Sequence, residues 1–179
     1  MKKLKLEELN RLSIPEYKNA EKLNVSILLD NVRSMFNVGS AFRTADAFRI
    51  EKMYLGGITG TPPHREINRS ALGATESVDW EYVERSSELV AKLKSKGYSI
   101  IAFEQTTESI PLHQFVAKSG QKLCLIFGNE VSGISEDVLE YTDFAVEIPQ
   151  HGTKHSLNIS VCLGIACWET YKNLLLTQP

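Results

Sequence analysis

The sequence predicts an α/β fold in which a mostly parallel sheet carries helices on both of its faces. Short, continuously apolar runs, which suit strands that are buried on both faces, alternate with segments of helical periodicity. The order of the predicted elements places helices between successive strands, which is typical of a parallel sheet.

Length and composition limit the possible classes of protein. The 179 residues suit one domain, residues 1–179, with a short helical extension over about residues 1–23. An apolar fraction of 42% is enough for a core, and the chain has no run of about 18 apolar residues that would predict a membrane span. The net charge of −2 shows no basic excess, so any nucleic-acid site must be a local patch. Cys124, Cys162 and Cys167 lack C-x-x-C spacing, which favours reduced thiols, no metal site and a cytoplasmic location.

The first part of the chain contains two predicted helices and two predicted strands. Lys2 to Leu12 is expected to form an amphipathic helix that stops before Pro15, because proline cannot continue a helix. We expect a strand over Asn24 to Asp30, a helix over about Phe36 to Phe48 and a second strand over Lys52 to Gly56. On the helix, a rotation of about 100° per residue turns Arg43 away from the apolar side.

The middle of the chain is less regular. We expect a long polar loop over Gly57 to Trp80, and loops of this length are often functional. An amphipathic helix over Ser86 to Lys96, a strand over Tyr98 to Phe103 and a short helix over Leu112 to Lys118 should follow.

Two polar loops follow the last predicted strands, Leu123 to Phe127 and Phe144 to Ile148. Ligands in open α/β sheets bind outside the carboxyl ends of the strands, so these loops are the first candidates for a site. The C-terminal helix, predicted over about Leu157 to Leu176, is apolar nearly all round and should be buried on most sides. The sheet can cover one side of this helix, and a second subunit is expected to cover the other.

The two loops resemble the second and third motifs of the SpoU, or TrmH-type, branch of the SPOUT RNA methyltransferases. The pattern G-x-E-x-x-G falls on Gly128, Glu130 and Gly133, and I-P-x-x-G-x-x-x-S-L-N-[VI]-S-V falls on Ile148 to Val161. The first motif, N-x-G-x-x-x-R-T-A, is then expected upstream, and it is found at Asn37, Gly39, Arg43, Thr44 and Ala45. Three motifs in the family's order make the resemblance specific.

The resemblance implies a fold, a reaction and a cofactor site. It implies a trefoil knot in the stretch from Leu123 to Trp168, and transfer of a methyl group from S-adenosylmethionine (AdoMet) to a ribose 2′-hydroxyl of structured RNA. The predicted cofactor-binding residues are Gly128, Ile148, Leu157, Thr106, Phe127 and Gln150. Family members form dimers, which agrees with the homodimer expected from the C-terminal helix.

Five residues receive catalytic roles from the resemblance. Arg43, which could otherwise be a solvated surface residue, becomes a proton acceptor or a phosphate clamp. The clamp is chemically simpler, because guanidinium stays protonated in proteins. Asn37 should orient its neighbours, and Glu130 could bind a ribose hydroxyl or, as we favour, tie down Asn37 or Arg43. Ser156 and Asn158 could orient the reactants or cap the last helix.

The RNA contacts and the RNA target are the least determined features. The predicted RNA-binding residues are basic, and Arg65 and Arg69 would share one face if their segment were helical; the set is Arg33, Arg65, Arg69 and Lys154. The amino-acid sequence of the third motif favours tRNA as the substrate, with guanosine 2′-O-methylation as one possibility. The alternatives are an rRNA 2′-O-methyltransferase and a non-catalytic RNA-binding module on the same scaffold.

Overall fold

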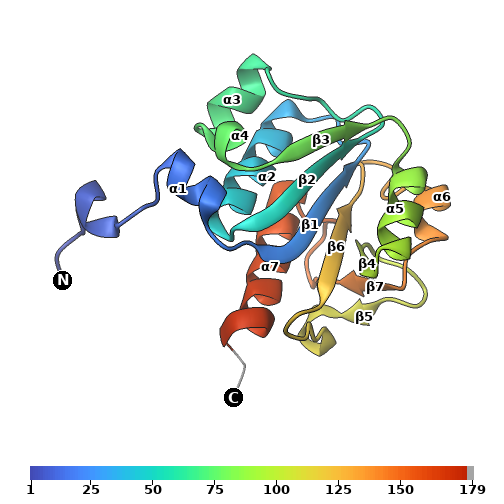
Figure 1. Ribbon diagram of the computed structural model, residues 1–179. Coiled ribbons are helices and arrows are strands. Elements are labelled where there is room, and N and C mark those ends of the chain that lie inside the picture. Colours follow the sequence, from blue (N-terminus) through green and yellow to red (C-terminus); the bar gives the residue numbers. More distant parts are fainter. Residues whose placement is uncertain (177–179) are drawn as a thin grey trace.

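Parallel strands form one sheet in the order β3-β2-β1-β6-β4-β7-β5, as the computed structural model of the protein shows (Figure 1). The structure describes residues 1–176, apart from the side chain of Leu6. The strands of the sheet, in chain order, are β1 (Leu23–Asp30), β2 (Ile50–Gly56), β3 (Trp80–Val83), β4 (Tyr98–Phe103), β5 (Ile110–Pro111), β6 (Lys122–Phe127) and β7 (Phe144–Glu147). Every pairing between these strands is parallel, which confirms the predicted fold class.

Helices cover both faces of the sheet (Figure 1). One face carries α2 (Met35–Ala47) and α7 (Ile159–Tyr171), and the other carries α5 (Ser86–Ser95) and α6 (Glu136–Leu139). Successive strand residues point to opposite faces, so the apolar residues of one strand enter two separate core clusters. In β1, for example, Ile27 belongs to the cluster under α2 and α7, while Leu28 belongs to the cluster under α5.

The N-terminal extension differs from its prediction. In place of one helix over Lys2 to Leu12, the structure has a 3-10 turn, η1 (Leu6–Leu9), and a separate short helix, α1 (Ile14–Asn19). Pro15 lies in the first turn of α1, where its missing N–H is not needed. The hydroxyl of Ser13 accepts a hydrogen bond from the Glu16 backbone N–H, so a capping box begins a helix at the position where proline was expected to end one.

The predicted long loop over Gly57 to Trp80 is also partly wrong, because it contains α3 (Arg65–Ala71) and α4 (Ala74–Ser77) and leads into β3. These helices are short and are held against α2 by a few buried side chains, such as Ile67. The motif-one glycine, Gly39, explains the close approach, because a Cβ there would lie 2.3 Å from the Ile67 carbonyl oxygen.

Further differences lie in the C-terminal half. The short helix expected over Leu112 to Lys118 is only a 3-10 turn, η2 (Leu112–Gln114), because Phe115 already has extended dihedral angles. The last helix begins at Ile159 and continues past Tyr171 as a π-helical turn, η3 (Lys172–Leu176). Within residues 1–176, no helix is long and apolar enough to cross a membrane.

The cysteines agree with the predicted reduced thiols. Cys124 and Cys167 are buried and Cys162 is half-buried, and all three are free. Burial raises the pKa of the Cys124 thiol to about 12, so it stays a neutral core side chain at physiological pH.

Candidate active site

A cavity of about 350 Å³ opens at the carboxyl ends of β4, β6 and β7. Its apolar lining includes Phe127, Ile148 and Leu157, three of the residues predicted from the sequence. Phe127 is held in place by Phe103 at the end of β4, since the two rings stack with their centroids 5.1 Å apart. The predicted residues Gly128 and Gln150 line the cavity as well.

Gly128 permits a backbone crossing at the floor of this cavity. A Cβ at Gly128 would lie 2.2 Å from both the Gly133 carbonyl carbon and the Ile134 nitrogen. The loop between them is closed by backbone hydrogen bonds in both directions between Asn129 and Gly133, each 2.9 Å long. Gly133 itself has a φ of +71°, which a side chain would disfavour. The backbone therefore requires glycine, for different structural reasons, at both glycine positions of the second motif.

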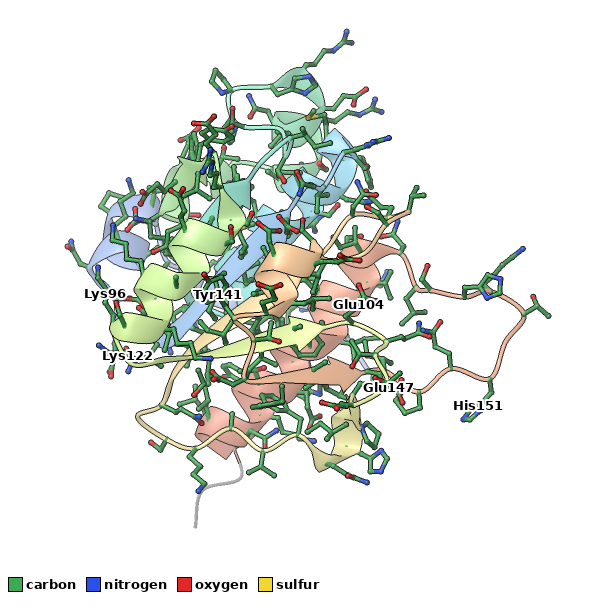
Figure 2. All side chains as sticks on the ribbon, turned by 90° about the vertical axis from the view of Figure 1, so that its right-hand side faces the viewer. Lys96, Glu104, Lys122, Tyr141, Glu147 and His151 are labelled. Atoms are coloured by element: carbon green, nitrogen blue, oxygen red, sulfur yellow. The ribbon has the colours of Figure 1, made fainter. Side chains whose placement is uncertain are left out.

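Glu104 is a cavity residue that the sequence analysis did not single out. It lies directly after β4, and its carboxylate accepts hydrogen bonds from the Ile134 N–H at 3.1 Å and the Gln105 N–H at 2.9 Å. Figure 2 shows Glu104 on the side of the sheet from which the loop bearing His151 extends. An acidic residue at the carboxyl end of a predicted strand was the available signal.

The next residue fastens the third-motif loop to the sheet. The Gln105 side-chain amide donates a 2.7 Å hydrogen bond to the His155 carbonyl oxygen, immediately before Ser156. Ser156 is exposed and lines the cavity, while Gln150 lines it from the other end of the loop. This loop therefore forms one wall of the cavity.

Asp30 is a second residue missed from the sequence, and it fixes the loop that follows the second motif. Its buried carboxylate accepts hydrogen bonds from the Ser86 hydroxyl at 2.6 Å and from the Ser135 N–H at 2.9 Å. The Ser135 hydroxyl donates to the same carboxylate. The end of β1 is thereby joined to α5 and to the loop that supports Gly133.

Side chains from all three motifs form one hydrogen-bonded chain. The Asn37 amide donates to Glu130 Oε1 at 3.0 Å, and the Asn158 amide donates to Asn37 Oδ1 at 3.3 Å. This confirms the structural tie between Glu130 and Asn37 that we favoured. The residues lie at the start of α2, after β6 and at the start of α7, so their meeting depends on the fold and not on sequence distance.

Glu130 is an ionised acceptor in this chain. Its burial alone would raise its pKa, but hydrogen bonds from Asn37 and from backbone N–H groups, including that of Arg33, outweigh burial and lower the pKa below the ordinary value. A carboxylate of this kind holds its donors in place at neutral pH. It is unsuited to donate a proton there.

The helix cap belongs to Asn158 and not to Ser156. Asn158 Oδ1 accepts from the Ser160 N–H at 2.9 Å at the start of α7, while its amide reaches Asn37. The alternative that Ser156 caps the helix is therefore wrong, because the helix begins at Ile159. Asn158 is both a cap and an orienting residue, which leaves Ser156 available to contact a ligand.

Four of the predicted catalytic and cofactor residues do not line the cavity: Asn37 and Asn158, which belong to the hydrogen-bonded chain beside it, and Thr106 and Arg43. Thr106 does not line it, because its hydroxyl accepts a hydrogen bond from the Glu108 N–H in the turn after β4; its prediction as a cofactor residue lacks support from the geometry. Arg43 is exposed and does not line the cavity either. It borders two other hollows, between α2 and the segments that surround it.

The predicted RNA-binding residues are all exposed, and they lie on three different segments. Arg33 lies between β1 and α2, Arg65 and Arg69 lie on α3, and Lys154 lies in the third-motif loop. Within residues 1–176, none of these side chains forms an ion pair. Charged groups without partners are free to meet phosphates.

A comparison with protein families decides what this arrangement is. Residues 24–168, which carry the sheet, the cavity and all three motifs, match the model of the SpoU rRNA Methylase family. The chain belongs to the SpoU family.

Similar proteins agree with this assignment. A tRNA (guanosine(18)-2′-O)-methyltransferase of Aquifex aeolicus is 30% identical over 150 residues, which are 82% of this chain and 68% of that protein. The AdoMet-bound rRNA methyltransferase from Sinorhizobium meliloti has a TM-score of 0.80 and 25% identity, with 89% of this chain and 60% of that one covered. A solved structure whose description concerns the 2-OH methylation of C/U34 on tRNA has a TM-score of 0.71 and 26% identity. The match covers 83% of this chain and 95% of that chain.

The SpoU chain described here is shorter than many of its relatives. It spans between 59% and 64% of the length of several curated relatives that it matches. The structural neighbours are SpoU methyltransferases, which supports the fold; the trefoil knot itself stays a prediction.

The SpoU cavity has the properties that AdoMet requires. Its volume lies within the range of small-molecule sites, and it combines apolar walls with a few polar groups at the rim. Phe127, Ile148 and Leu157 can enclose an adenine ring, and the glycine loop allows backbone groups to approach its polar edge. Glu104 and Gln150 are placed at the lining to pair with polar groups of a ligand.

Proposed function

We propose that this SpoU protein transfers a methyl group from AdoMet to a ribose 2′-hydroxyl of RNA. The observation that carries the proposal is the Asn158–Asn37–Glu130 chain, which joins all three motifs beside the cavity. This arrangement has one side for a small, partly apolar cofactor and one side, at α2 and α3, whose arginines form no ion pair with other residues of 1–176. The names of the relatives support the same reaction.

The roles of the chain's residues follow from their positions. Bound AdoMet would supply an electrophilic methyl group. Ser156, at the cavity lining, would hold the acceptor hydroxyl near the methyl group, since such transfers need an approach of about 3–3.5 Å. Glu130 and Asn158 keep Asn37 in one orientation. Arg43 would clamp a phosphate of the substrate and stabilise the developing alkoxide, a role that needs no neutral guanidine; the hydroxyl proton would pass to the clamped phosphate or to water.

Cofactor binding and product analysis test this proposal together. Calorimetry should detect AdoMet binding without RNA, because the cavity is built by this chain's own second and third motifs and by Glu104. A 2′-O-methyl ribose resists alkaline cleavage at its linkage, so the product should become resistant at one position. No binding at millimolar AdoMet, or a methylated base with unchanged cleavage, would overturn the proposal.

The favoured substrate is tRNA. The likeness to a tRNA methyltransferase and to a structure concerned with tRNA supports this choice, although the likeness to an rRNA enzyme is comparable. Mass spectrometry of RNA from a deletion strain, before and after the protein is restored, should show one tRNA ribose that loses and regains its methyl group. A change confined to rRNA would reverse the choice. The reaction is expected in the cytoplasm, which the free cysteines support.

A homodimer is also part of the proposal. The face of α7 away from the sheet leaves Val161 and Trp168 about half exposed, at 50% and 49%. A second copy would cover this face and could bring Arg43 closer to a cavity than one chain does. Val161→Asp should give a monomer by sedimentation at micromolar concentration, whereas Val116→Asp, at a residue that is 66% exposed near η2, should not. A wild-type monomer under the same conditions would refute the dimer.

A non-catalytic RNA-binding module is the competing function. Such a module would have no need for a cavity whose surroundings are held by a hydrogen bond to Glu104 and by hydrogen bonds from the side-chain amides of Gln105 and Asn158. Wild-type protein that binds RNA but neither binds AdoMet nor methylates any RNA would favour that alternative.

A further inference from the structure

A second hollow, here called the arginine groove, lies between the N-terminal segment, α2 and α4. Its volume is about 480 Å³, and it shares no lining residue with the cofactor cavity. Arg11 reaches it from the segment before α1, Arg43 from α2, and Arg49 from the turn that leads into β2. Figure 1 shows these segments gathered on the side of the molecule away from α5 and α6.

The charges of the groove are unbalanced. Asp46 is the single acidic residue of the lining, and its carboxylate accepts a hydrogen bond from the Ser77 hydroxyl. Within the part of the chain that the structure describes, Arg11, Arg43 and Arg49 form no ion pair. A positive groove on a chain with a net charge of −2 is a local feature that attracts an anionic partner.

Arg49 is an unexpected residue for its backbone position. Its φ of +49° lies in the left-handed region, where glycine or asparagine is favoured. The turn itself is fixed by the backbone, since the Arg49 N–H donates to the Asp46 carbonyl and the Arg49 carbonyl accepts from the Leu23 N–H. These backbone bonds do not use the arginine side chain, so the turn by itself does not select arginine at this position.

The groove is continuous with the proposed catalytic arginine. Arg43 lines both the arginine groove and an adjoining hollow of about 590 Å³, which Arg69 of α3 also lines. Arg11, Arg49, Arg43 and Arg69 thus border two neighbouring hollows that meet at Arg43. Several separate guanidinium groups beside one another suit a chain of phosphates better than a single small anion.

We propose that the arginine groove binds the phosphodiester backbone of the substrate RNA, next to the nucleotide whose ribose is methylated. This inference rests on the proposed function, because that function supplies the polyanion. Arg11 and Arg49 would contact phosphates that flank the one held by Arg43. Their contacts carry affinity and register, and they read no base.

The test measures binding of an unmodified, fluorescently labelled tRNA transcript to full-length protein over a series of salt concentrations. The groove variants are Arg49→Asn, which suits the left-handed backbone, and Arg11→Gln in the exposed N-terminal segment. Lys96→Gln is the matched control, because Lys96 is an exposed cation at the end of α5 on the other face of the sheet. Arg49→Lys keeps the positive charge that Arg49→Asn removes.

Each groove variant should weaken tRNA binding about tenfold and reduce the slope of log Kd against log salt by about one, as expected for one lost phosphate contact. Arg49→Lys should recover most of the slope, and Lys96→Gln should stay within about twofold of wild type. The affinity for AdoMet, measured by calorimetry, should not change in Arg49→Asn or Arg11→Gln, since the groove and the cavity share no residues.

The possible failures are distinguishable. If wild-type protein binds and methylates tRNA but both groove variants behave like Lys96→Gln, the groove proposal is wrong and the methyltransferase proposal stands. If wild-type protein neither binds nor methylates RNA, the proposed function itself fails. If Arg49→Asn does not fold, Arg11→Gln still decides the question, because its exposed side chain makes no hydrogen bond within the described residues.

Discussion

The cofactor cavity and the arginine-bearing face of α2 and α3 are built in opposite ways. In the cavity, Glu104, Gln105 and Asn158 are fixed by hydrogen bonds within the chain, and Gly128 lets two backbone segments touch. On the other face, Arg43, Arg65 and Arg69 are exposed and unpaired within the described residues. The first region is complete in one chain, while the second needs a partner to satisfy its charges.

This difference fits the two ligands of the proposed reaction. A small cofactor is held by a preorganised cavity, whose order is established during folding. A large polyanion contributes its own charges and releases counterions, so an array of free arginines is sufficient to bind it. Substitutions on the arginine-bearing face should therefore change catalysis and RNA binding. Substitutions in the cofactor cavity should change folding stability and cofactor binding.

The largest effect is expected for Arg43→Ala. The residue is exposed on α2 and is absent from the cavity lining, so the variant should fold, dimerise and bind AdoMet almost normally. Turnover at saturating RNA should fall by about 10²–10⁴, the range for loss of a positioned charge or proton-transfer group. If single-turnover assays show more than about half of wild-type activity, Arg43 is only a surface residue.

Arg43→Lys separates the two chemical roles of this residue. Lysine keeps a point charge but loses the planar fork that holds a phosphate through two hydrogen bonds. A bidentate clamp predicts little recovery of turnover, and we expect that result. Recovery to near wild-type turnover would show that charge alone is enough.

Gly128→Ala should damage the cofactor region with little direct effect on the arginine face. The new Cβ would lie 2.2 Å from backbone atoms of Gly133 and Ile134, which cannot move aside as a flexible side chain could. We expect a loss of about 1–3 kcal/mol in unfolding free energy and at least a tenfold loss in AdoMet affinity by calorimetry. Gly152→Ala is the steric control, because its Cβ would meet nothing within 4 Å, and its stability should be unchanged.

The sequence predicts the fold better than it predicts the short elements. Mainly apolar runs such as Val25 to Leu29, in which Ser26 is the one polar residue, suit a strand covered on both faces, and this run is found in such a strand. The α3 and α4 helices have no comparable signal, since each is shorter than two turns and depends on packing against α2. Pro15 was expected to end a helix, but it lies in the first turn of α1, which Ser13 caps.

The site shows the same limit at the level of single residues. Gly128, Ile148 and Leu157 were predictable because each belongs to a motif, and all three line the cavity. Glu104 belongs to no motif, and its importance depends on β4 lying beside β6 and β7, a neighbour relation that no local pattern contains. Thr106 does not line the cavity, because its hydroxyl accepts from the Glu108 N–H in the turn after β4, and its cofactor role stays a prediction.

Glu104→Gln should have an intermediate effect. An amide can still accept one hydrogen bond, but it removes the charge that receives the Ile134 and Gln105 N–H groups. We expect a loss of about 1–2 kcal/mol in unfolding free energy and a severalfold weaker affinity for AdoMet, with an unchanged salt dependence of RNA binding. A variant with wild-type affinity for AdoMet would restrict Glu104 to a structural role.

The smallest effect concerns the pH dependence of Glu130. Its carboxyl pKa is lowered from the ordinary value of 4.5, because hydrogen bonds from Asn37 and backbone N–H groups outweigh burial. A carboxyl group whose pKa is lower in the folded chain than in the unfolded chain stabilises the fold at pH values above the unfolded-state pKa. This stabilisation is lost as the pH falls through the folded-state pKa.

The Tm difference between wild type and Glu130→Gln should therefore be constant at neutral pH and shrink below about pH 4.5. The partly exposed carboxylate is screened by solvent, so its contribution to the free energy of unfolding should stay under about 1 kcal/mol. Glu108→Gln, at an exposed carboxylate in the turn after β4, gives the baseline. A difference that grows towards acid pH would mean that Glu130 is protonated in the folded chain, and the Asn37 amide would then lack its anionic acceptor.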